Sequence, residues 1–487
     1  MVAPGFDRRS VVGFDEGLSV IDRAVSRAVG AERIEGNSVR LLRDAAENYP
    51  AWLEAILAAR HYVLFEAYIM RDDAAGRFFA DALIERSRAG VKVRVIYDWL
   101  GALGKTRSRL WTLMRAAGVE VRCFNRFSIA SPLGWVHRDH RKSIVVDGQV
   151  AFVTGLCVGD AWVGDPSRNI APWRDTGVEI RGPAVADVEK AFARVWGVTG
   201  TPMPANAQSA TFPPHGEGDV SVRIVASEPW SGKLLRLDEV LAGAASETLW
   251  LTDAYYAGMS SHVQALRAAA RDGVDVRLLV PGGSDLPVLR MLSRAGYRPL
   301  LEAGVRVFEW NGPMLHAKTA VADRRLARVG SSNLNIASWL GNYELDAVIE
   351  DATFAEELAL QYERDLSNSR EVVLYPNRRE RSVARRSAAE ERRRQPRKRG
   401  EGGASSGVAG ALRLGNTVTA AVTDHRVLGS SDARAIGVGG AILIALALVA
   451  TLWPRVLAVP FALLSVWFGI SLVIQAHRLE RPGTSKG

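Results

Sequence analysis

The sequence predicts an α/β fold in which two repeated α/β/α halves share one active site, followed by a C-terminal two-helix membrane hairpin. Three observations in the 487 residues lead to this prediction. Strand-like and helix-like segments recur in the same order in both halves, one histidine-centred motif occurs twice, and two long apolar spans stand near the C-terminus. The divisions that we expect are an N-terminal extension (1–35), a first half (36–205), a second half (206–375), an Arg-rich linker (376–407), a possible interfacial segment (408–434) and a transmembrane hairpin (435–476).

The repeat is visible along the chain as the same succession of segments. In the first half EAYIM (66–70) precedes a helical stretch (76–90), a strand (91–98) and a further strand (118–125). In the second half the corresponding segments are DAYYA (253–257), a helical stretch (262–273) and two strands (274–281 and 304–311). Apolar strands that alternate with such helices indicate βαβ units, and therefore a mostly parallel sheet covered by helices. Two such halves form a pseudo-dimer, in which the motif histidines are expected where the halves pack together.

The first motif lies in HRKSIVVDGQVAFV, which begins at His140 and reads as a strand, a two-residue Asp-Gly turn and a second strand. Side chains alternate along a strand, so His140 and Lys142 are expected on the same face. Asp147 stands at the turn, and at ~3.3 Å per residue it is on the order of 20 Å from His140. We therefore expect Asp147 to fix the hairpin rather than to serve its own histidine. Asp323 stands at the equivalent corner of the second motif.

The second motif begins at His316 and again has a lysine two residues later. If its turn is Asp323-Arg324, antiparallel pairing returns Ser331 to a position beside His316, with Asn333 just beyond. Histidine, lysine, serine and asparagine would then converge at one end of the hairpin. They offer a nucleophile or acid, a fixed positive charge and neutral hydrogen-bond donors, a set that suits a phosphate diester better than an acyl group or a sugar.

Two histidines from two halves complete the chemistry of covalent phosphoryl transfer. One imidazole attacks phosphorus, while a second group protonates the leaving oxygen and then deprotonates the incoming alcohol or water. The motif lysines compensate the charge on the phosphate oxygens, so we expect neither a metal nor a cofactor. The string HRDH, His137–His140, could suggest a metal site of the HxHxDH kind, but Trp135 occupies the position of the further histidine.

A nucleophilic imidazole must present the correct tautomer, so each histidine should be oriented by a carboxylate. Asp175, in PWRDTGVEI, and Glu344, in NYELDAVI, occupy matching positions downstream of the two motifs. Both precede apolar, strand-like runs. Each taken singly could equally be a surface or structural acid, yet their matching positions favour the orienting role.

The net charge of +9 comes mainly from one short segment. Residues 378–399 contain eleven Arg or Lys and three Glu, a local net charge of +8, which leaves the rest of the chain near neutral. A nuclease that follows a phosphate backbone more often has a basic groove on its folded domain, so nucleic acid is not the expected partner. The segment is either a solvated linker or an electrostatic clamp on anionic lipid headgroups. The two cysteines, Cys123 and Cys157, exclude a disulfide framework.

Two apolar spans follow, Ile436–Trp453 and Val456–Gln475, each of 18 to 20 residues. About 20 residues cross a bilayer, whereas a pair of buried core helices, the alternative, would seldom lack a polar face over this length. Flanking arginines place both ends of the hairpin in the cytoplasm, although the short Pro454-Arg455 connection also fits a re-entrant wedge. The N-terminus lacks the apolar run of a signal peptide, so the motif-bearing part is expected in the cytoplasm.

At these motifs the sequence resembles the phospholipase D superfamily, whose signature is HxKxxxxD followed after six residues by GSxN or GGxN. The second motif matches throughout, at His316, Lys318, Asp323, Gly330, Ser331 and Asn333. The first matches at His140, Lys142 and Asp147. It departs afterwards, because Thr154 replaces the first glycine and Cys157 the asparagine, and only Gly155 agrees. The resemblance covers roughly residues 36–375 and is greatest to bacterial cardiolipin synthases and related phosphatidyltransferases.

The resemblance implies a phosphatidyl-histidine intermediate, with His140 as the nucleophile and His316 as the general acid and base. The expected site contains His140, Lys142, Asp147, His316, Lys318 and Asp323 as catalytic residues, Ser331 and Asn333 on phosphate, and Asp175 and Glu344 as the residues that orient the histidines. Cysteine is a poor hydrogen-bond donor, so Asn333 is expected to carry more of the phosphate contact than Cys157. The donor would be phosphatidylglycerol or a similar phospholipid, and the acceptor an alcohol or water.

Three functions are consistent with these features. The first is a phosphatidyltransferase or phospholipase D that makes cardiolipin-like lipids on the cytoplasmic side of the inner membrane. The second is a membrane-tethered phosphodiesterase acting on nucleic acid, and the third is a membrane scaffold with a retired site. The near-neutral body and the hairpin weigh against the second, and the two intact HxKxxxxD motifs weigh against the third. Cardiolipin synthases more usually carry their spans at the N-terminus, so the C-terminal placement also fits a related lipid enzyme with another acceptor.

Overall fold

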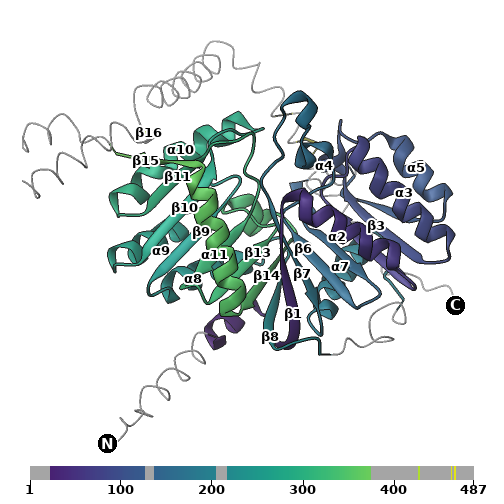
Figure 1. Cartoon of the computed structure of the whole chain (residues 1–487), viewed down its shortest axis with the longest axis horizontal. Coiled ribbons are helices and arrows are strands. Elements are labelled where there is room, and N and C mark those ends of the chain that lie inside the picture. Colours follow the sequence, from purple (N-terminus) through teal and green to yellow (C-terminus); the bar gives the residue numbers. More distant parts are fainter. Residues whose placement is uncertain are drawn as a thin grey trace, which may run out of the picture.

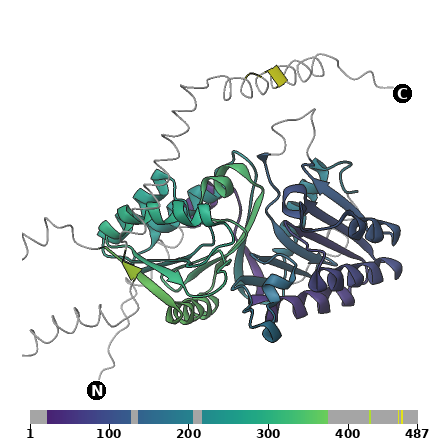
Figure 2. The ribbon, with the colours of Figure 1, turned by 90° about the horizontal axis from the view of Figure 1, so that it is seen from above.

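One sheet runs through both halves of the protein. The computed structural model describes residues 22–126, 136–204 and 216–374, with 426–427, 462 and 466–467. Its strands form a single 16-stranded sheet in the order β16-β15-β11-β10-β9-β12-β13-β14-β8-β1-β7-β6-β5-β2-β3-β4. The halves fan apart from β1 and β8, which meet at the bottom of the view in Figure 1, and they appear as two lobes from above in Figure 2.

The elements follow each other in two matching series. The first half contains β1 (Ile34–Arg43), α2 (Asp44–Ala58), β2 (Tyr62–Ala67), α3 (Ala74–Arg88), β3 (Lys92–Asp98), α4 (Trp99–Ala102), α5 (Ser108–Ala116), β4 (Glu120–Phe124), β5 (Lys142–Val146), β6 (Val150–Thr154), α6 (Asp160–Val163), η2 (Pro166–Arg168), β7 (Thr176–Arg181) and α7 (Val185–Val198). The second contains β8 (Val220–Ser227), α8 (Lys233–Ala244), β9 (Thr248–Thr252), α9 (Ser260–Arg271), β10 (Asp275–Pro281), α10 (Pro287–Glu302), β11 (Arg306–Trp310), β12 (Thr319–Ala322), β13 (Leu326–Gly330), η5 (Ala337–Gly341), β14 (Glu344–Glu350), α11 (Ala352–Ser367), β15 (Ser369–Val373) and β16 (Arg426–Val427).

The strand order confirms the predicted repeat. Read outward from the centre, β1-β7-β6-β5-β2-β3-β4 in the first half corresponds to β8-β14-β13-β12-β9-β10-β11 in the second. The prediction of a mostly parallel sheet is wrong, because only β2-β3-β4, β9-β10-β11 and the short β15-β16 pair are parallel. Each motif strand belongs to a tight hairpin, and a tight hairpin can join only antiparallel strands. The centre of the sheet is therefore antiparallel.

Both motif hairpins have three-residue turns instead of the two-residue turns that the sequence suggested. Val146 pairs with Val150, and Ala322 pairs with Leu326. Asp147 and Asp323 begin the two turns with φ of 54° and 50°. A three-residue turn with left-handed residues is the next most common hairpin connection after the two-residue turn. The extra residue moves the register by one, so the pairing of Thr319 with Val329, continued past the end of β12, places Ser332 rather than Ser331 across from the histidine of the second motif.

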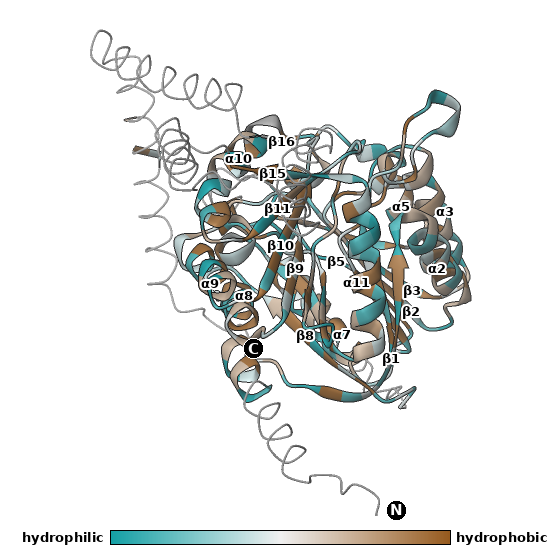
Figure 3. Cartoon of the chain, turned by 60° about the vertical axis from the view of Figure 1, so that its left-hand side comes forward, coloured by the Kyte–Doolittle hydropathy of each residue, from teal (hydrophilic) through white to brown (hydrophobic). Residues whose placement is uncertain are grey.

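The hydrophobic core has one part that both halves share and one part within each half. Alternate residues of each strand face opposite sides of the sheet. Leu64 and Val145 face the shared core, where α7 and α11 pack, whereas Val63 and Phe65 face the first half's own core beneath α2, α3 and α5. The corresponding core of the second half lies beneath α8, α9 and α10. Figure 3 shows the hydrophobic strands of the interior and the more hydrophilic helix surfaces around them.

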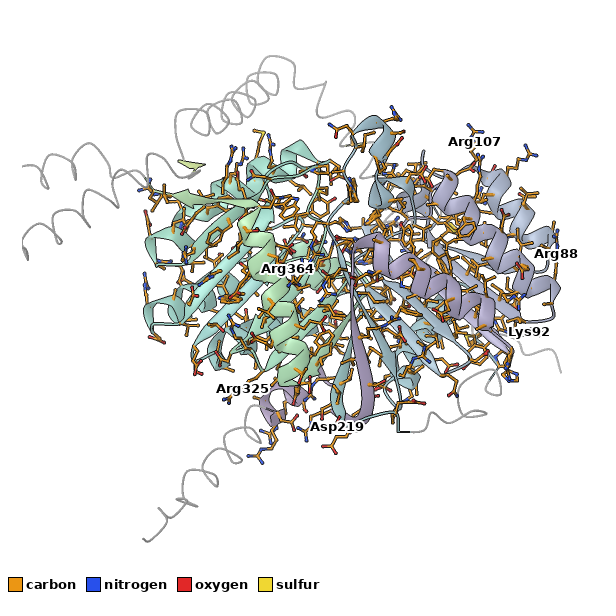
Figure 4. The ribbon with its side chains drawn as sticks, viewed as in Figure 1. Arg88, Lys92, Arg107, Asp219, Arg325 and Arg364 are labelled. Carbon is orange, nitrogen blue, oxygen red and sulfur yellow. The ribbon has the colours of Figure 1, made fainter. Side chains whose placement is uncertain are left out.

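The two motifs point their histidines toward the same end of the molecule. β3 begins at Lys92, which lies low in Figure 4, and Arg107 follows its other end at the top. Arg325, in the turn between β12 and β13, also lies at the bottom, so the chain before β12, with His316, is at the top. Lys142 pairs with Ala67 at the C-terminal end of β2 and is therefore at the top as well. We call this the histidine end.

The predicted C-terminal features lie almost entirely outside the described residues. That part of the chain includes the whole Arg-rich linker, the transmembrane hairpin except residues 462, 466 and 467, and the possible interfacial segment except residues 426 and 427. Within the portion that the structure does describe, none of the helices has the length and apolar character required to cross a bilayer.

Candidate active site

Two short backbone bridges between the halves build the site. Asp139 forms a parallel bridge with Tyr343, in which His140 N donates to Tyr343 O at 3.0 Å. Arg174 forms the equivalent bridge with Leu315, in which His316 N donates to Arg174 O at 2.7 Å. In both cases the chain leading into a motif histidine pairs with the chain leading into a strand of the other half.

Each bridge brings the histidine of one half to the carboxylate of the other. His140 Nδ1 lies 3.0 Å from both carboxylate oxygens of Glu344, and His316 Nδ1 lies 2.7 Å from Asp175 Oδ2. All four side chains are buried. With a carboxylate at Nδ1, that nitrogen carries the proton and donates it, so Nε2 retains the lone pair. The sequence suggested these two carboxylates but not that each serves the opposite half.

A further polar group holds each carboxylate in place. Ser331 Oγ donates to Glu344 Oε2 at 2.5 Å, and Trp162 Nε1 donates to Asp175 Oδ2 at 3.0 Å. The expectation that Ser331 binds phosphate stays a prediction; in this structure its buried hydroxyl is engaged by Glu344 and also accepts from Leu345 N. Sequence reasoning missed Trp162, which follows the first motif but has no counterpart in the family signature.

The space around each carboxylate explains why the two motifs differ at one position. Gly155 stands where the second motif has Ser331. A Cβ at Gly155 would lie only 2.2 Å from Asp175 Oδ1. Only glycine at position 155 allows the Asp175 carboxylate to stay where it is. In the second half Ser331 donates a hydrogen bond to the orienting carboxylate, and in the first half Trp162 donates the corresponding one.

Thr154, the first departure from the signature, performs a task that a carboxylate performs in the second half. Thr154 pairs with Gly177, whereas its counterpart Gly330 pairs with Asp346. Thr154 Oγ1 accepts from Leu156 N at 3.0 Å. In the second half Asp346 Oδ1 accepts from Ser331 N and Ser332 N at 2.9 and 3.1 Å. In the first half the loop after β6 is held by Thr154 of β6, and the paired residue on β7 is the small Gly177. In the second half the loop after β13 is held by Asp346 of β14, and the paired residue on β13 is the small Gly330.

The second departure, Cys157, is buried beside the site. Its carbonyl accepts from the Tyr49 hydroxyl at 2.7 Å. Burial raises the pKa of the Cys157 thiol, which makes the thiolate needed for nucleophilic attack scarce at neutral pH. Its counterpart Asn333 is also buried, and its Oδ1 has no hydrogen-bond partner among the described residues. This oxygen can only accept a hydrogen bond, so a contact from Asn333 to a phosphate would have to come from its amide nitrogen Nδ2.

Both motif lysines are buried, and each lies against its own histidine. Lys142 Nζ donates to His140 O, and Lys318 Nζ donates to His316 O and lies 3.0 Å from His316 Nδ1. Burial lowers the pKa of Lys318 to about 8. An ammonium that is costly to keep charged in the empty site gains strongly from an incoming phosphate.

Tyrosines in matching positions flank the two histidine–lysine pairs. Tyr68 lies edge-on to His140 with ring centroids 4.8 Å apart, and Tyr255 lies edge-on to His316 at 5.9 Å. Lys142 Nζ is 5.2 Å from the Tyr68 ring centroid. The repeated strings EAYIM and DAYYA contain these tyrosines and were the signal that could have identified them.

The electrostatics of the histidines indicate a single shared site. Burial lowers the pKa of His140 and lowers that of His316 to about 4, and in both cases the nearby lysine lowers it further while the carboxylate opposes the shift. Lys318 also lowers the pKa of His140, and Lys142 that of His316. Each histidine therefore experiences the charge of the other half's lysine, and both are neutral in the empty site at neutral pH.

The motif aspartates are not at the histidines. Asp147 accepts from the backbone N–H groups of residues 60–62 at 2.7 to 2.8 Å, and Asp323 accepts from those of residues 246–248. These segments lead into β2 and β9. The catalytic assignment that the motif implied for Asp147 and Asp323 is therefore not supported by their positions, which fit the expected role of fixing the hairpin.

The arrangement can support in-line displacement at phosphorus. Two neutral imidazoles with Nδ1 on carboxylates supply a nucleophile and an acid–base group, and two buried ammonium groups supply positive charge. Among the described residues there is no group of three or more His, Cys, Asp or Glu side chains that could hold a metal ion.

Comparisons with known proteins agree with this geometry. A family model described as "Cardiolipin synthase, PLD-like domain" matches residues 52–196 and 240–366. The chain is 35% identical over 360 residues to cardiolipin synthase A of Pseudomonas aeruginosa, covering 72% of this chain and 71% of that protein. It is 32% identical over 349 residues to cardiolipin synthase of Alkalihalophilus pseudofirmus, covering 70% and 69%. The structure of phosphatidylserine synthase from Haemophilus influenzae has the same fold, with a TM-score of 0.58 and 15% identity over 72% of this chain and 92% of that one.

Proposed function

Because this chain belongs to the phospholipase D superfamily and is a cardiolipin synthase-like phosphatidyltransferase, we propose that it converts two phosphatidylglycerol molecules into cardiolipin and glycerol. The observation that carries the proposal is the pair of imidazoles, each with Nδ1 on a carboxylate of the opposite half. That arrangement leaves two Nε2 atoms for one phosphodiester. Covalent transfer needs two such groups, one for phosphorus and one for the proton.

In the first step His140 Nε2 attacks the phosphorus of the donor. A nitrogen–phosphorus bond forms, the bond from phosphorus to the glycerol oxygen breaks, and His316 Nε2 delivers its proton to that oxygen. The donor's negative charge raises the pKa of the nearby His316 and so favours the protonated form that this step requires. Glycerol leaves, and the phosphatidyl group remains on His140.

In the second step the headgroup hydroxyl of another phosphatidylglycerol replaces glycerol. His316 Nε2 takes the proton of this hydroxyl, its oxygen attacks phosphorus, and the bond to His140 breaks. The products are cardiolipin and the original enzyme. Lys142 and Lys318 are the groups that we assign to the charge on the phosphate oxygens in both steps, with Asn333 as a neutral donor.

The orienting carboxylates make both steps efficient without contacting the lipid. Glu344 and Asp175 keep Nδ1 protonated and stabilise the charge that each ring gains when Nε2 bonds to phosphorus or to a proton. Although burial alone would raise their pKa values, the adjacent histidines and lysines lower them, so both carboxylates stay ionised.

We further propose that the C-terminal spans hold the catalytic part at the cytoplasmic face of the inner membrane. The two apolar spans and the arginines around them support this location. Extraction of membranes with alkaline carbonate tests it: the full chain should stay with the membrane, and a chain that ends before Ile436 should be released. Release of both would contradict a spanning anchor.

The reaction is tested with phosphatidylglycerol that carries a ¹³C-labelled headgroup, using the full chain in detergent and mass spectrometry of lipids and glycerol. We expect cardiolipin and one labelled glycerol for each cardiolipin formed. Phosphatidic acid in place of cardiolipin would mean that water is the acceptor and the enzyme a hydrolase. Absence of turnover, together with cleavage of single-stranded DNA, would replace the lipid proposal with the phosphodiesterase alternative.

A further inference from the structure

Large apolar side chains are exposed around the active site at the histidine end. We call six of these exposed residues the apolar rim: Leu100, Leu103, Val136, Trp230, Leu286 and Ile336. They come from both halves and from separate segments, of which the short helix α4 carries Leu100. Trp230 is 74% exposed and Leu103 is 56% exposed. Scattered exposed apolar residues need no explanation, but a group on separate segments around one site indicates an interaction surface.

Hydrogen bonds connect the rim of the first half to the motif histidine. The Asp98 carboxylate accepts from Leu100 N at 2.8 Å and from Asp139 N at 3.0 Å. α4, with Leu103 directly after it, is therefore fixed to the residue that precedes His140. Val136 begins the segment that leads into the same histidine.

The rim of the second half is connected in the same way. Tyr255, which lies edge-on to His316, donates its hydroxyl to Asp285 at 2.8 Å, and Leu286 is the next residue. Ile336 follows Asn335, whose side chain donates to Tyr255 O at 2.9 Å. The rim segments of both halves are therefore hydrogen-bonded to segments that carry the motif histidines or the tyrosines beside them.

Trp230 closes the rim between the halves. Its N–H donates to Leu340 O at 2.8 Å, and its ring lies edge-on to His137 with centroids 5.9 Å apart. His137 in turn contacts Gly341 O through Nδ1 at 2.9 Å. Trp230 has φ of 64°, a left-handed conformation that costs a bulky residue energy and is retained mainly at functional positions. The fold thus presents an indole to solvent at some energetic cost.

We infer that the apolar rim is the surface by which the catalytic part of the chain enters the headgroup region of a phospholipid bilayer. The inference rests on the proposed lipid substrate, because a diacyl donor leaves its bilayer only at great cost and must reach the histidines through this end. Indole is the side chain best suited to the boundary between headgroups and acyl chains, and leucine and isoleucine suit the layer beneath it. The predicted C-terminal spans would bring the bilayer within reach of the rim.

The charge around the rim suits an anionic bilayer. Arg107, whose side chain is 82% exposed, lies at the top of Figure 4, which is the histidine end. Its guanidinium is 3.8 Å from Asp72, so it is only loosely paired and free to turn toward a lipid phosphate. Asp285, which precedes Leu286 of the rim, is an exposed acid, and its carboxylate accepts from the Tyr255 hydroxyl.

The test compares two forms of one substrate for the full chain and three variants. Phosphatidylglycerol is offered in vesicles, which must be entered, and as its dihexanoyl form below the critical micelle concentration, which needs no surface. Trp230→Glu and Leu103→Glu alter the rim. Leu57→Glu is the matched control, because Leu57 is 40% exposed at the end of α2, close to the Asp147 turn and far from the histidine end.

We expect the ratio of vesicle activity to dihexanoyl activity to fall about tenfold or more in either rim variant, as a charge at the interface weakens insertion. We expect the Leu57→Glu ratio to equal that of wild type. Equal ratios in all four proteins, or an equal fall in the control, would overturn the rim proposal. Failure of the wild type on both substrates would overturn the proposed function instead.

A second measurement decides the rim proposal without turnover. The full chain is reconstituted into vesicles whose acyl chains carry bromine, which quenches tryptophan fluorescence on contact. The difference between wild type and Trp230→Phe isolates the signal of Trp230, since both proteins share every other tryptophan. We expect that difference to be quenched by the brominated chains. A difference signal that is insensitive to bromine would contradict insertion of the rim.

Discussion

His316 Nδ1 lies 2.7 Å from Asp175 Oδ2, although the two residues belong to different halves of the chain. The same exchange occurs between His140 and Glu344. Neither half can therefore fix the tautomer of its own histidine, and the site exists only when the halves are packed together. Each half therefore contributes a histidine to the site and also the carboxylate that orients the histidine of the other half.

Replacing Asp175 with asparagine should lower kcat by about 10²–10⁴-fold, because an amide at Nδ1 permits the wrong imidazole tautomer. KM should change little, since Asp175 does not contact lipid. Steady-state kinetics with phosphatidylglycerol measures both. Asp187→Asn is the matched control and should be silent, because Asp187 is a half-buried aspartate on α7 that pairs with the exposed Lys190. The double variant Asp175→Asn/His316→Ala should be no slower than His316→Ala alone; a fully additive loss would mean that Asp175 does not act through His316.

Gly155→Ala should reduce kcat while the protein stays folded. A Cβ there would lie 2.2 Å from Asp175 Oδ1, so the carboxylate must move away from His316. We expect a loss of about 10-fold to 100-fold, the range seen when a supporting contact of a catalytic group is displaced. Gly197→Ala serves as the control, because a Cβ at Gly197 meets no atom within 4 Å. Equal activity of the two variants would remove the steric explanation of the Gly155/Ser331 difference.

The sequence was sufficient to predict the repeat and to single out most of the side chains that the structure gathers at the candidate site, because both depend on patterns that recur at fixed spacing. It failed where spacing does not decide geometry. The motif turn could close with two residues or with three, and the added residue changed what lies opposite His316. Ser331 looked like a phosphate ligand because it belongs to the signature, but its partner Glu344 can be found only in three dimensions.

The exchange of carboxylates between the halves was also beyond the sequence. Asp175 follows His140 and Glu344 follows His316 along the chain, which suggests pairing within each half. Two backbone bridges, Asp139 with Tyr343 and Arg174 with Leu315, instead bring each histidine to the carboxylate of the other half. Each bridge joins only one residue to one other, so it leaves no periodic pattern in the sequence. The role of Trp162 could not be predicted either. Its indole donates to Asp175 as Ser331 donates to Glu344, but Trp162 does not stand at the position of the signature serine.

Asp147→Asn and Asp323→Asn should lower stability rather than catalysis. Each carboxylate accepts several backbone N–H groups, and loss of the charge should cost about 1–3 kcal/mol of the free energy of unfolding. Denaturant unfolding checks the stability, and kcat per folded molecule should remain near that of wild type. A large fall in kcat without loss of stability would restore these aspartates to the catalytic set.

The pH dependence of the same hydrogen bonds has a definite sign. Although burial opposes the shift, backbone hydrogen bonds lower the pKa of Asp323 below its ordinary value. Its contribution to stability is therefore present above the unfolded pKa of about 4 and is lost as pH falls through the folded pKa. The stability difference between wild type and Asp323→Asn should shrink on acidification. A difference that grows below pH 4 would contradict this assignment.

Lys318 should set the alkaline limit of kcat/KM. Burial lowers its pKa to about 8, so above that pH the free enzyme loses the positive charge that a phosphate requires. Bound lipid restores the proton, so the corresponding fall in kcat should occur at higher pH. In Lys318→Arg the guanidinium does not titrate in this range, and whatever activity remains should lack the limb near pH 8. Persistence of the limb in Lys318→Arg would assign it to another group.

The division of labour between the histidines is tested most directly with phosphatidyl-p-nitrophenol, whose leaving group needs no proton. In His316→Ala we expect a rapid burst of about one p-nitrophenolate per enzyme and a phosphatidyl adduct on His140 in the quenched protein, because attack is intact and resolution is not. In His140→Ala we expect neither burst nor adduct. A burst of equal size in both variants, or an adduct only on His316, would contradict the assignment of His140 as the nucleophile of one site built by two halves.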